Sequence, residues 1–185
     1  MEGQGIIFVV SAPSGGGKGT ILEALADVGA TMQSSVSATT RKPRLAEKDG
    51  VDYRFVDRQQ FEEWIGQDKF VEWAEVHGQL YGTLKEELER QRGSGESVIL
   101  ELDVQGMRSV KEKFDKVVSI FIAPPSMEVL EQRLRDRGGL EDAELNTRLA
   151  NARKELTCRD EYDHVIVNDK IEDAVVAFMG IIGAA

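Results

Sequence analysis

The chain has 185 residues and a formal net charge of −10, and 41% of its residues are hydrophobic. This length suffices for one globular domain with a buried core, and Cys158, the single cysteine, excludes an intrachain disulfide and indicates a reducing compartment. The acidic balance excludes a broad nucleic-acid-binding surface. The first apolar run has no basic leader, and the apolar stretch Ala174–Ala185 is shorter than the ~20 residues of a membrane span. We therefore expect a cytoplasmic protein with no nucleic-acid or membrane partner.

Short apolar runs alternate with helical patterns along most of the chain. The runs that predict buried strands are Ile6–Val10, Val98–Leu102, Val117–Ala123 and His164–Val167. The segments that predict helices are Thr20–Asp27, Val104–Phe114, Ser126–Arg137 and a last helix that Asp169 or Asp173 caps and that ends near Ile182. This alternation predicts an α/β fold with a parallel β-sheet core flanked by helices.

Two stretches interrupt the alternation. Residues 32–83 contain the short β-like pieces Ser35–Thr39, Asp52–Val56 and Phe70–Val76 and a helix around Phe61–Ile65, which predict an inserted β-rich subdomain. Residues 126–157 include a charged helix within Gly138–Thr157 that follows two glycines and has little apparent apolar surface, so we expect a mobile helical arm. The remaining segments, 1–31, 84–125 and 158–185, are predicted to form the core.

A glycine-rich segment, Ser11–Thr20 (SAPSGGGKGT), lies between the first predicted strand and helix. Consecutive glycines let backbone N–H groups turn toward phosphate oxygens, the helix adds its dipole, and Lys18 adds a positive charge. The segment departs from the usual G-x-x-x-x-G-K-[ST] pattern at Ala12 and Gly19, so Thr20 becomes the candidate for the hydroxyl on magnesium. The alternatives are an ordinary glycine-rich turn and, for Thr20, a plain first-turn residue. The candidate phosphate-binding residues are Ser14, Gly15, Gly16, Gly17, Lys18, Gly19 and Thr20.

Several blocks of the sequence, in order, resemble those of guanylate kinase. They are Ser35–Arg44 (SVSATTRKPR), Gly50–Phe55 (GVDYRF), Phe70–Ala74 (FVEWA), Tyr81–Thr83 (YGT), Leu100–Gly106 (LELDVQG), Ile122–Ser126 (IAPPS) and Val165–Asp169 (VIVND). The resemblance implies a P-loop nucleoside monophosphate kinase that transfers the ATP γ-phosphoryl group to GMP with magnesium. It implies a GMP-binding subdomain at 32–83 and a lid at 126–157. We expect a monomer or a small homo-oligomer.

The resemblance assigns two sets of residues to GMP. Arg41, Arg44, Tyr53 and Tyr81 would hold its phosphate, because guanidinium forks match phosphate oxygens and tyrosine hydroxyls donate to them. Ser37, Glu72, Thr83 and Asp103 would read the base, since a carboxylate accepts from both N1–H and the exocyclic amine of guanine. The alternative for the first set is a solvated basic turn. Thr83 and Glu86 also match a capping box that opens a helix over Leu84–Arg92.

The resemblance also places residues on the ATP side. Lys18, Arg41, Arg137 and Arg148 would stabilise the charge of the transferring phosphoryl group, while Arg133 binds the triphosphate and Asn168 meets adenine. Glu101 ends a strand at the carboxyl edge of the sheet, where it would act on magnesium with Thr20, through water if not directly. The alternatives are a solvated arginine face on the arm and, for Asn168, a turn residue.

Two other functions remain open from the sequence. The changes at Ala12 and Gly19 suit a non-catalytic guanylate-kinase-like module that binds protein ligands, although Lys18 is retained. The Gly-Lys-Gly-Thr ending resembles adenylate kinases and suggests a preference for AMP. Glu72 argues against AMP, because adenine presents no N1–H to that carboxylate.

Overall fold

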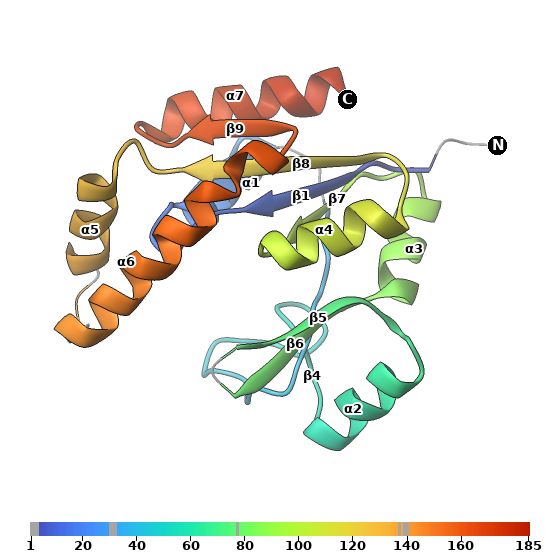
Figure 1. The fold of residues 1–185 in the computed structure, drawn as a ribbon. Helices are drawn as coiled ribbons and strands as arrows, with labels where there is room; N and C mark the ends of the chain where they lie inside the picture. Colours follow the sequence, from blue (N-terminus) through green and yellow to red (C-terminus); the bar gives the residue numbers. More distant parts are fainter. Residues whose placement is uncertain (1–3, 30–32, 77, 137, 139–140) are drawn as a thin grey trace. The chain divides into compact units, whose positions relative to one another are not determined.

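The computed structural model describes residues 4–29, 33–76, 78–136, 138 and 141–185 (Figure 1). The chain divides into two compact units, each assembled from separate segments. The first unit comprises residues 1–7, 33–100 and 105–117, and the second comprises residues 8–32, 101–104 and 118–185.

A five-stranded sheet has the strand order β2-β7-β1-β8-β9. Its strands are β1 (Ile7–Ser11), β2 (Gln33–Ser34), β7 (Val98–Glu101), β8 (Val117–Ala123) and β9 (His164–Val167). β2 pairs with β7 in parallel, and β8 pairs with β9 in parallel. All five residues of β1 are buried, as are Ile120, Phe121 and Ile122 of β8, so side chains on both faces of these strands are covered. The α/β class and the four predicted strands are confirmed.

The helices of the second unit pack through apolar stripes. They are α1 (Lys18–Asp27), α5 (Met127–Asp136), α6 (Asp142–Thr157) and α7 (Ile171–Ala184), with a 3-10 turn at Arg159–Glu161. Leu145, Leu149 and Ala152 of α6 are buried against Leu130 and Leu134 of α5. The prediction that this charged helix has little apolar surface is therefore wrong: three small or aliphatic residues at helical spacing suffice to form one buried face.

The start of α7 differs from the sequence prediction. Its N-cap is Lys170, and no side chain of a described residue caps it, so the predicted caps Asp169 and Asp173 are both wrong. Asp173 instead lies in the first turn with Glu172, where a negative charge interacts favourably with the helix dipole.

The first unit contains a second, mixed sheet with the order β4-β3-β6-β5. Its strands are β3 (Ala38–Thr39), β4 (Arg54–Phe55), β5 (Phe70–Val76) and β6 (Gln79–Leu84), and the helices are α2 (Arg58–Gly66), α3 (Lys85–Gly93) and α4 (Val104–Lys113), whose residues from Gln105 on belong to this unit. β6 is antiparallel to both of its neighbours, and β3 is parallel to β4. A small core fixes α2 against this sheet, with Phe61 stacked on Phe70 at 4.3 Å between ring centroids.

Arg92 stabilises the first unit from inside, since it is only 5% exposed. Its Nε donates to the Gly5 carbonyl at 3.1 Å and its Nη2 donates to the Asp115 carbonyl at 3.2 Å. We expect Arg92→Leu to lower the free energy of unfolding by about 2–3 kcal/mol, because both carbonyls lose a charged donor. Urea denaturation followed by circular dichroism measures this. Arg90→Leu, which breaks an exposed pair with Glu87, is the control, and an equal loss in both variants would contradict the prediction.

Within the described part of the chain, every helix falls short of the length and apolarity needed to cross a membrane.

Candidate functional site

The glycine-rich segment forms a tight loop between β1 and α1 in the second unit. Gly15 and Gly17 have φ angles of 89° and 91°, which side chains rarely adopt, and the Gly16 N–H donates to the Pro13 carbonyl at 2.8 Å. A Cβ at Gly17 would lie 2.2 Å from Nδ2 of Asn168. The loop conformation therefore requires glycine at these positions, and α1 begins directly after it with its N–H groups unpaired by a side-chain cap.

Lys18 is the first residue of α1 and is paired with a carboxylate. Its Nζ lies 3.4 Å from Oε2 of Glu101, the last residue of β7. Thr20 lies two residues further along the first turn of α1 and is exposed. A Cβ at Gly19 would meet no described atom within 4 Å, so this glycine is not required by packing. The structure thus brings Lys18 and Glu101 together, as expected of a phosphate loop beside a strand-end carboxylate.

Asn168 and Arg133 are connected to the glycine loop. The Nδ2 of Asn168 donates to the Gly16 carbonyl at 2.9 Å, and the Nη2 of Arg133 donates to the Asn168 carbonyl at the same distance. Asn168 is only 2% exposed, and its Oδ1 has no hydrogen-bond partner among the described residues. Sequence reasoning assigned Asn168 to adenine and missed this bond to the loop, which joins residues 152 positions apart.

Arg148 of α6 reaches the same loop. Its Nη1 donates to Oγ of Ser14 at 3.4 Å, while Nη2 donates to Glu144 at 2.6 Å. Arg137 was assigned to the site, and Gly139 to the hinge before α6. Both residues lie outside the described residues. Gly138 has a φ of 70°, which only glycine adopts readily.

Glu155 of α6 is a charged residue of this unit that sequence reasoning missed. Burial raises the pKa of Glu155 most, and the negative charge of Asp103 raises it further, while the positive charge of Lys18 opposes the shift. Asp103, assigned by resemblance to guanine, belongs to the second unit, whereas the other assigned GMP-binding residues belong to the first. The charged pattern of α6 gave no signal for Glu155.

In the first unit, Arg41 is held by a carboxylate and by aromatic rings. Its Nη2 lies 2.8 Å from Oε1 of Glu47, and its guanidinium carbon lies 5.3 Å from the centroid of the Tyr53 ring. The hydrogen bond that Arg41 donates to Glu47 raises the pKa of Arg41 most, and Tyr81 raises it further. The same bond lowers the pKa of Glu47. The structure thus brings three of the four assigned phosphate ligands together.

Glu47 also connects the fourth assigned phosphate ligand. Its Oε2 accepts from the backbone N–H of Arg44 at 2.8 Å, so one carboxylate holds the turn that carries both arginines. Sequence reasoning missed Glu47. Its spacing of three and six residues from the two arginines was the available signal.

Glu72 of β5 faces Thr83 of β6. One carboxylate oxygen, Oε1, accepts from the Thr83 N–H at 3.0 Å and from Thr83 Oγ1 at 2.7 Å. Thr83 is 1% exposed, and its hydroxyl is therefore committed to Glu72. The predicted capping box is wrong, because α3 follows Leu84 and no described side chain caps it. Ser37 directly precedes β3, whose Ala38 pairs with Gly82, so Ser37 lies beside Thr83 in register.

The loop after β1, the following helix and Lys18 define a phosphate-binding-loop protein of the α/β class. The guanylate kinase family model matches residues 4–185. A guanylate kinase of Clostridium perfringens is 47% identical over 174 residues, covering 94% of this chain and 81% of that protein. A guanylate kinase of Synechocystis is 42% identical over 180 residues, covering 97% and 94%. The chain belongs to the guanylate kinase family.

Solved structures agree with this assignment. The crystal structure of guanylate kinase from Anaplasma phagocytophilum superposes with a TM-score of 0.75 at 37% identity, covering 100% of this chain and 87% of that one. The structure of TT1252 from Thermus thermophilus, at 15% identity and a TM-score of 0.56, shares the fold alone. The predicted family and the predicted enzyme class, a kinase, are confirmed.

Proposed function

We propose that this protein transfers the γ-phosphoryl group of ATP to GMP, giving ADP and GDP. The observation that carries the proposal is the occurrence, in one chain of the guanylate kinase family, of a phosphate loop with Lys18 and a carboxylate, Glu72, that accepts two hydrogen bonds from Thr83. The phosphate loop suits a nucleoside triphosphate. The Glu72 carboxylate suits a base with two adjacent hydrogen-bond donors.

The donor half of the reaction uses the second unit. Backbone N–H groups of the loop and the N-terminus of α1 bind phosphate oxygens of ATP. Lys18 leaves its ion pair with Glu101 and binds the outer phosphates. Arg133 and Arg148, together with Arg137, stabilise the negative charge that spreads over the transferring group. Asn168 holds the Gly16 carbonyl and keeps the loop in shape. Adenine would contact the same asparagine.

A magnesium ion fits the oxygen donors at this loop. Magnesium prefers oxygen ligands, keeps several waters, and is usually held by one or two protein groups together with substrate phosphates. The exposed hydroxyl of Thr20 and the half-exposed carboxylate of Glu101 would hold it. When bound, the ion neutralises charge on the phosphates of ATP.

The acceptor half uses the first unit. The GMP phosphate is bound by Arg41 and Arg44 together with the hydroxyls of Tyr53 and Tyr81. Arg41 gives up its ion pair with Glu47 when it binds this phosphate. Glu72 accepts N1–H and the exocyclic amine of guanine, while Ser37 and Thr83 lie at the same edge of the base. Asp103, a residue of the second unit, is assigned to guanine as a further carboxylate.

The chemistry needs positioning rather than a base. An oxygen of the GMP phosphate, already anionic at pH 7, forms a bond to the γ-phosphorus as the bond from that phosphorus to the β–γ bridging oxygen breaks. No proton has to be removed from the acceptor, so the lysine and the arginines act by alignment and charge stabilisation. We place this reaction in the cytoplasm, with nucleotides as the only required partners of a monomer or small homo-oligomer.

The test is an ADP-release assay with ATP and magnesium, in which GMP, AMP, UMP and CMP are offered separately. We expect turnover with GMP and at most a few per cent of that rate with the others, because only guanine pairs both donors with Glu72. Preferred turnover of AMP would overturn the base assignment. A folded sample that turns over none of the four would instead favour the non-catalytic binding module.

A further inference from the structure

The strand that carries Glu72 contains one extra residue just before that carboxylate. Phe70 of β5 pairs with Leu84 of β6. Glu72 pairs with Thr83, the preceding residue of β6, so Val71 is the extra residue of a β-bulge. If a regular ladder continued from the first pair, Thr83 would face Val71, an apolar side chain. The bulge therefore decides that a carboxylate lies opposite Thr83.

The partner strand is shaped for this bulge at Gly82. A Cβ at this position would lie 2.8 Å from Cδ1 of Phe70 and 2.9 Å from the carbonyl oxygen of Glu72. Both distances are shorter than any real Cβ contact. The backbones of β5 and β6 thus approach here more closely than a side chain would allow, which is the typical use of glycine beside a bulge.

The carbonyl of the bulge residue Val71 accepts hydrogen bonds from side chains outside the sheet. Val71 is 0% exposed, and β5 lies at the edge of its sheet, next to β6 among the described strands. Two side chains of α4 satisfy this carbonyl: Ser109 Oγ donates at 3.1 Å, and Lys113 Nζ donates to the same oxygen. The two donors are four residues apart and so lie on one face of the helix. A buried carbonyl that lost both donors would be strongly destabilised.

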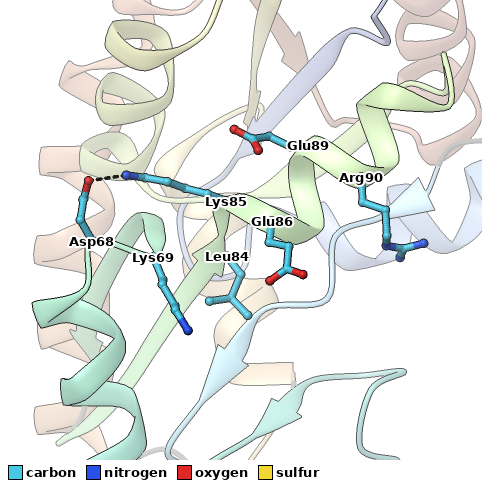
Figure 2. Close-up of a pocket in the computed structure, with 7 residues that line it drawn as sticks. All are labelled: Asp68, Lys69, Leu84, Lys85, Glu86, Glu89 and Arg90. Atoms are coloured by element: carbon cyan, nitrogen blue, oxygen red, sulfur yellow. Dashed lines mark hydrogen bonds and ion pairs between the residues drawn. The ribbon is translucent and has the colours of Figure 1, made fainter.

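The residues before the bulge are fixed separately, by α3. The Lys85 N–H donates to the Lys69 carbonyl at 2.9 Å, and Lys85 Nζ donates to Asp68 at 2.6 Å (Figure 2). Asp68, Lys69 and Lys85 help to line a cavity of about 620 Å³. The hydrogen bond from Lys85 lowers the pKa of Asp68 most, and the positive charge of Lys113 lowers it slightly further. This agrees with Lys113 lying near this end of β5.

We infer that Ser109 and Lys113 are positioning residues for guanine recognition: by bonding the Val71 carbonyl they hold the bulge that turns Glu72 toward Thr83 and the base. This inference rests on the proposed function, because it assigns a purpose to the guanine-reading role of Glu72. Neither residue touches the substrate. Their effect is transmitted through one backbone carbonyl, immediately next to Glu72 in the chain.

The experiment measures KM for GMP and for ATP in Lys113→Met, Ser109→Ala and the double variant. We expect the KM for GMP to rise about tenfold in Lys113→Met and further in the double variant, with the KM for ATP unchanged. Discrimination between GMP and inosine monophosphate, which lacks the exocyclic amine, should fall. Lys113→Arg should restore most of the wild-type KM, because it keeps a charged donor at this position.

Two further variants separate the possible failures. Lys85→Met makes the same charge change near the same end of β5, but it removes only a bond to a side chain, so its KM for GMP should match the wild type. If Glu72→Gln leaves the KM for GMP unchanged, the proposed guanine site itself fails. If Glu72→Gln raises it while Lys113→Met only lowers the melting temperature, or raises both KM values equally, the positioning role is overturned.

Discussion

Lys18→Met is expected to reduce the turnover number with ATP and GMP by about 10²–10³-fold while the fold is retained. The ammonium group adjoins the phosphate loop and pairs with an exposed carboxylate, so its removal deletes charge from the outer phosphates without opening the core. Little stability is lost, because exposed ion pairs contribute on the order of 0–1 kcal/mol. Rates of ADP release at saturating nucleotide, with urea denaturation of the same sample, measure both quantities.

Lys154→Met provides the control for this variant. Lys154 is exposed on α6 in the same unit, and the change alters net charge equally. Its turnover number should match the wild type. Turnover of Lys18→Met within tenfold of the wild-type value would show that Lys18 does not act on the reacting phosphates.

Glu72→Gln is expected to raise the KM for GMP about ten- to a hundredfold and to leave the KM for ATP unchanged. The new amide can keep its oxygen toward the Thr83 N–H and hydroxyl, which now bond Oε1 of Glu72. Its NH₂ group would then meet the two donors of guanine, and donors facing donors form no bond. Initial-rate kinetics with each nucleotide varied in turn give the two constants.

Glu75→Gln is the matched control for Glu72→Gln. Glu75 lies three residues further along β5, on the opposite face of the strand, and forms an exposed pair with Arg58. Its KM for GMP should stay at the wild-type value. An equal rise in the KM for ATP and for GMP in Glu72→Gln would mean that the substitution perturbs the protein generally and that the carboxylate does not bind the base.

The strands and most helices could be predicted because their signals are local. Val117–Ala123 and Phe70–Val76 have the predicted bounds: the first is a continuous apolar run, and the second is a short piece rich in β-forming residues. The glycine loop was also recognisable, because three glycines before a lysine at a strand–helix junction cost conformational entropy that an ordinary turn would not require.

The features that escaped prediction depend on contacts between distant segments. The bulge at Val71 requires Gly82 and two donors from α4, none of which marks β5 itself as irregular. The buried face of α6 depends on the leucines of α5, and the bond between Asn168 and Gly16 depends on how β9 ends beside the loop. In each case the residue type is common at such a position, and its structural role depends on a partner that is distant in the sequence.

Three of the cations assigned to phosphate have a carboxylate partner in the structure: Lys18 has Glu101, Arg41 has Glu47 and Arg148 has Glu144. These long side chains are therefore already confined to few rotamers before a nucleotide arrives. A side chain immobilised only on binding would cost about 0.5–1.5 kcal/mol at that moment, and here much of that entropy is lost during folding. An acidic chain can thus present ordered positive charge to its substrates, with the arriving phosphate taking over a position that a carboxylate has held.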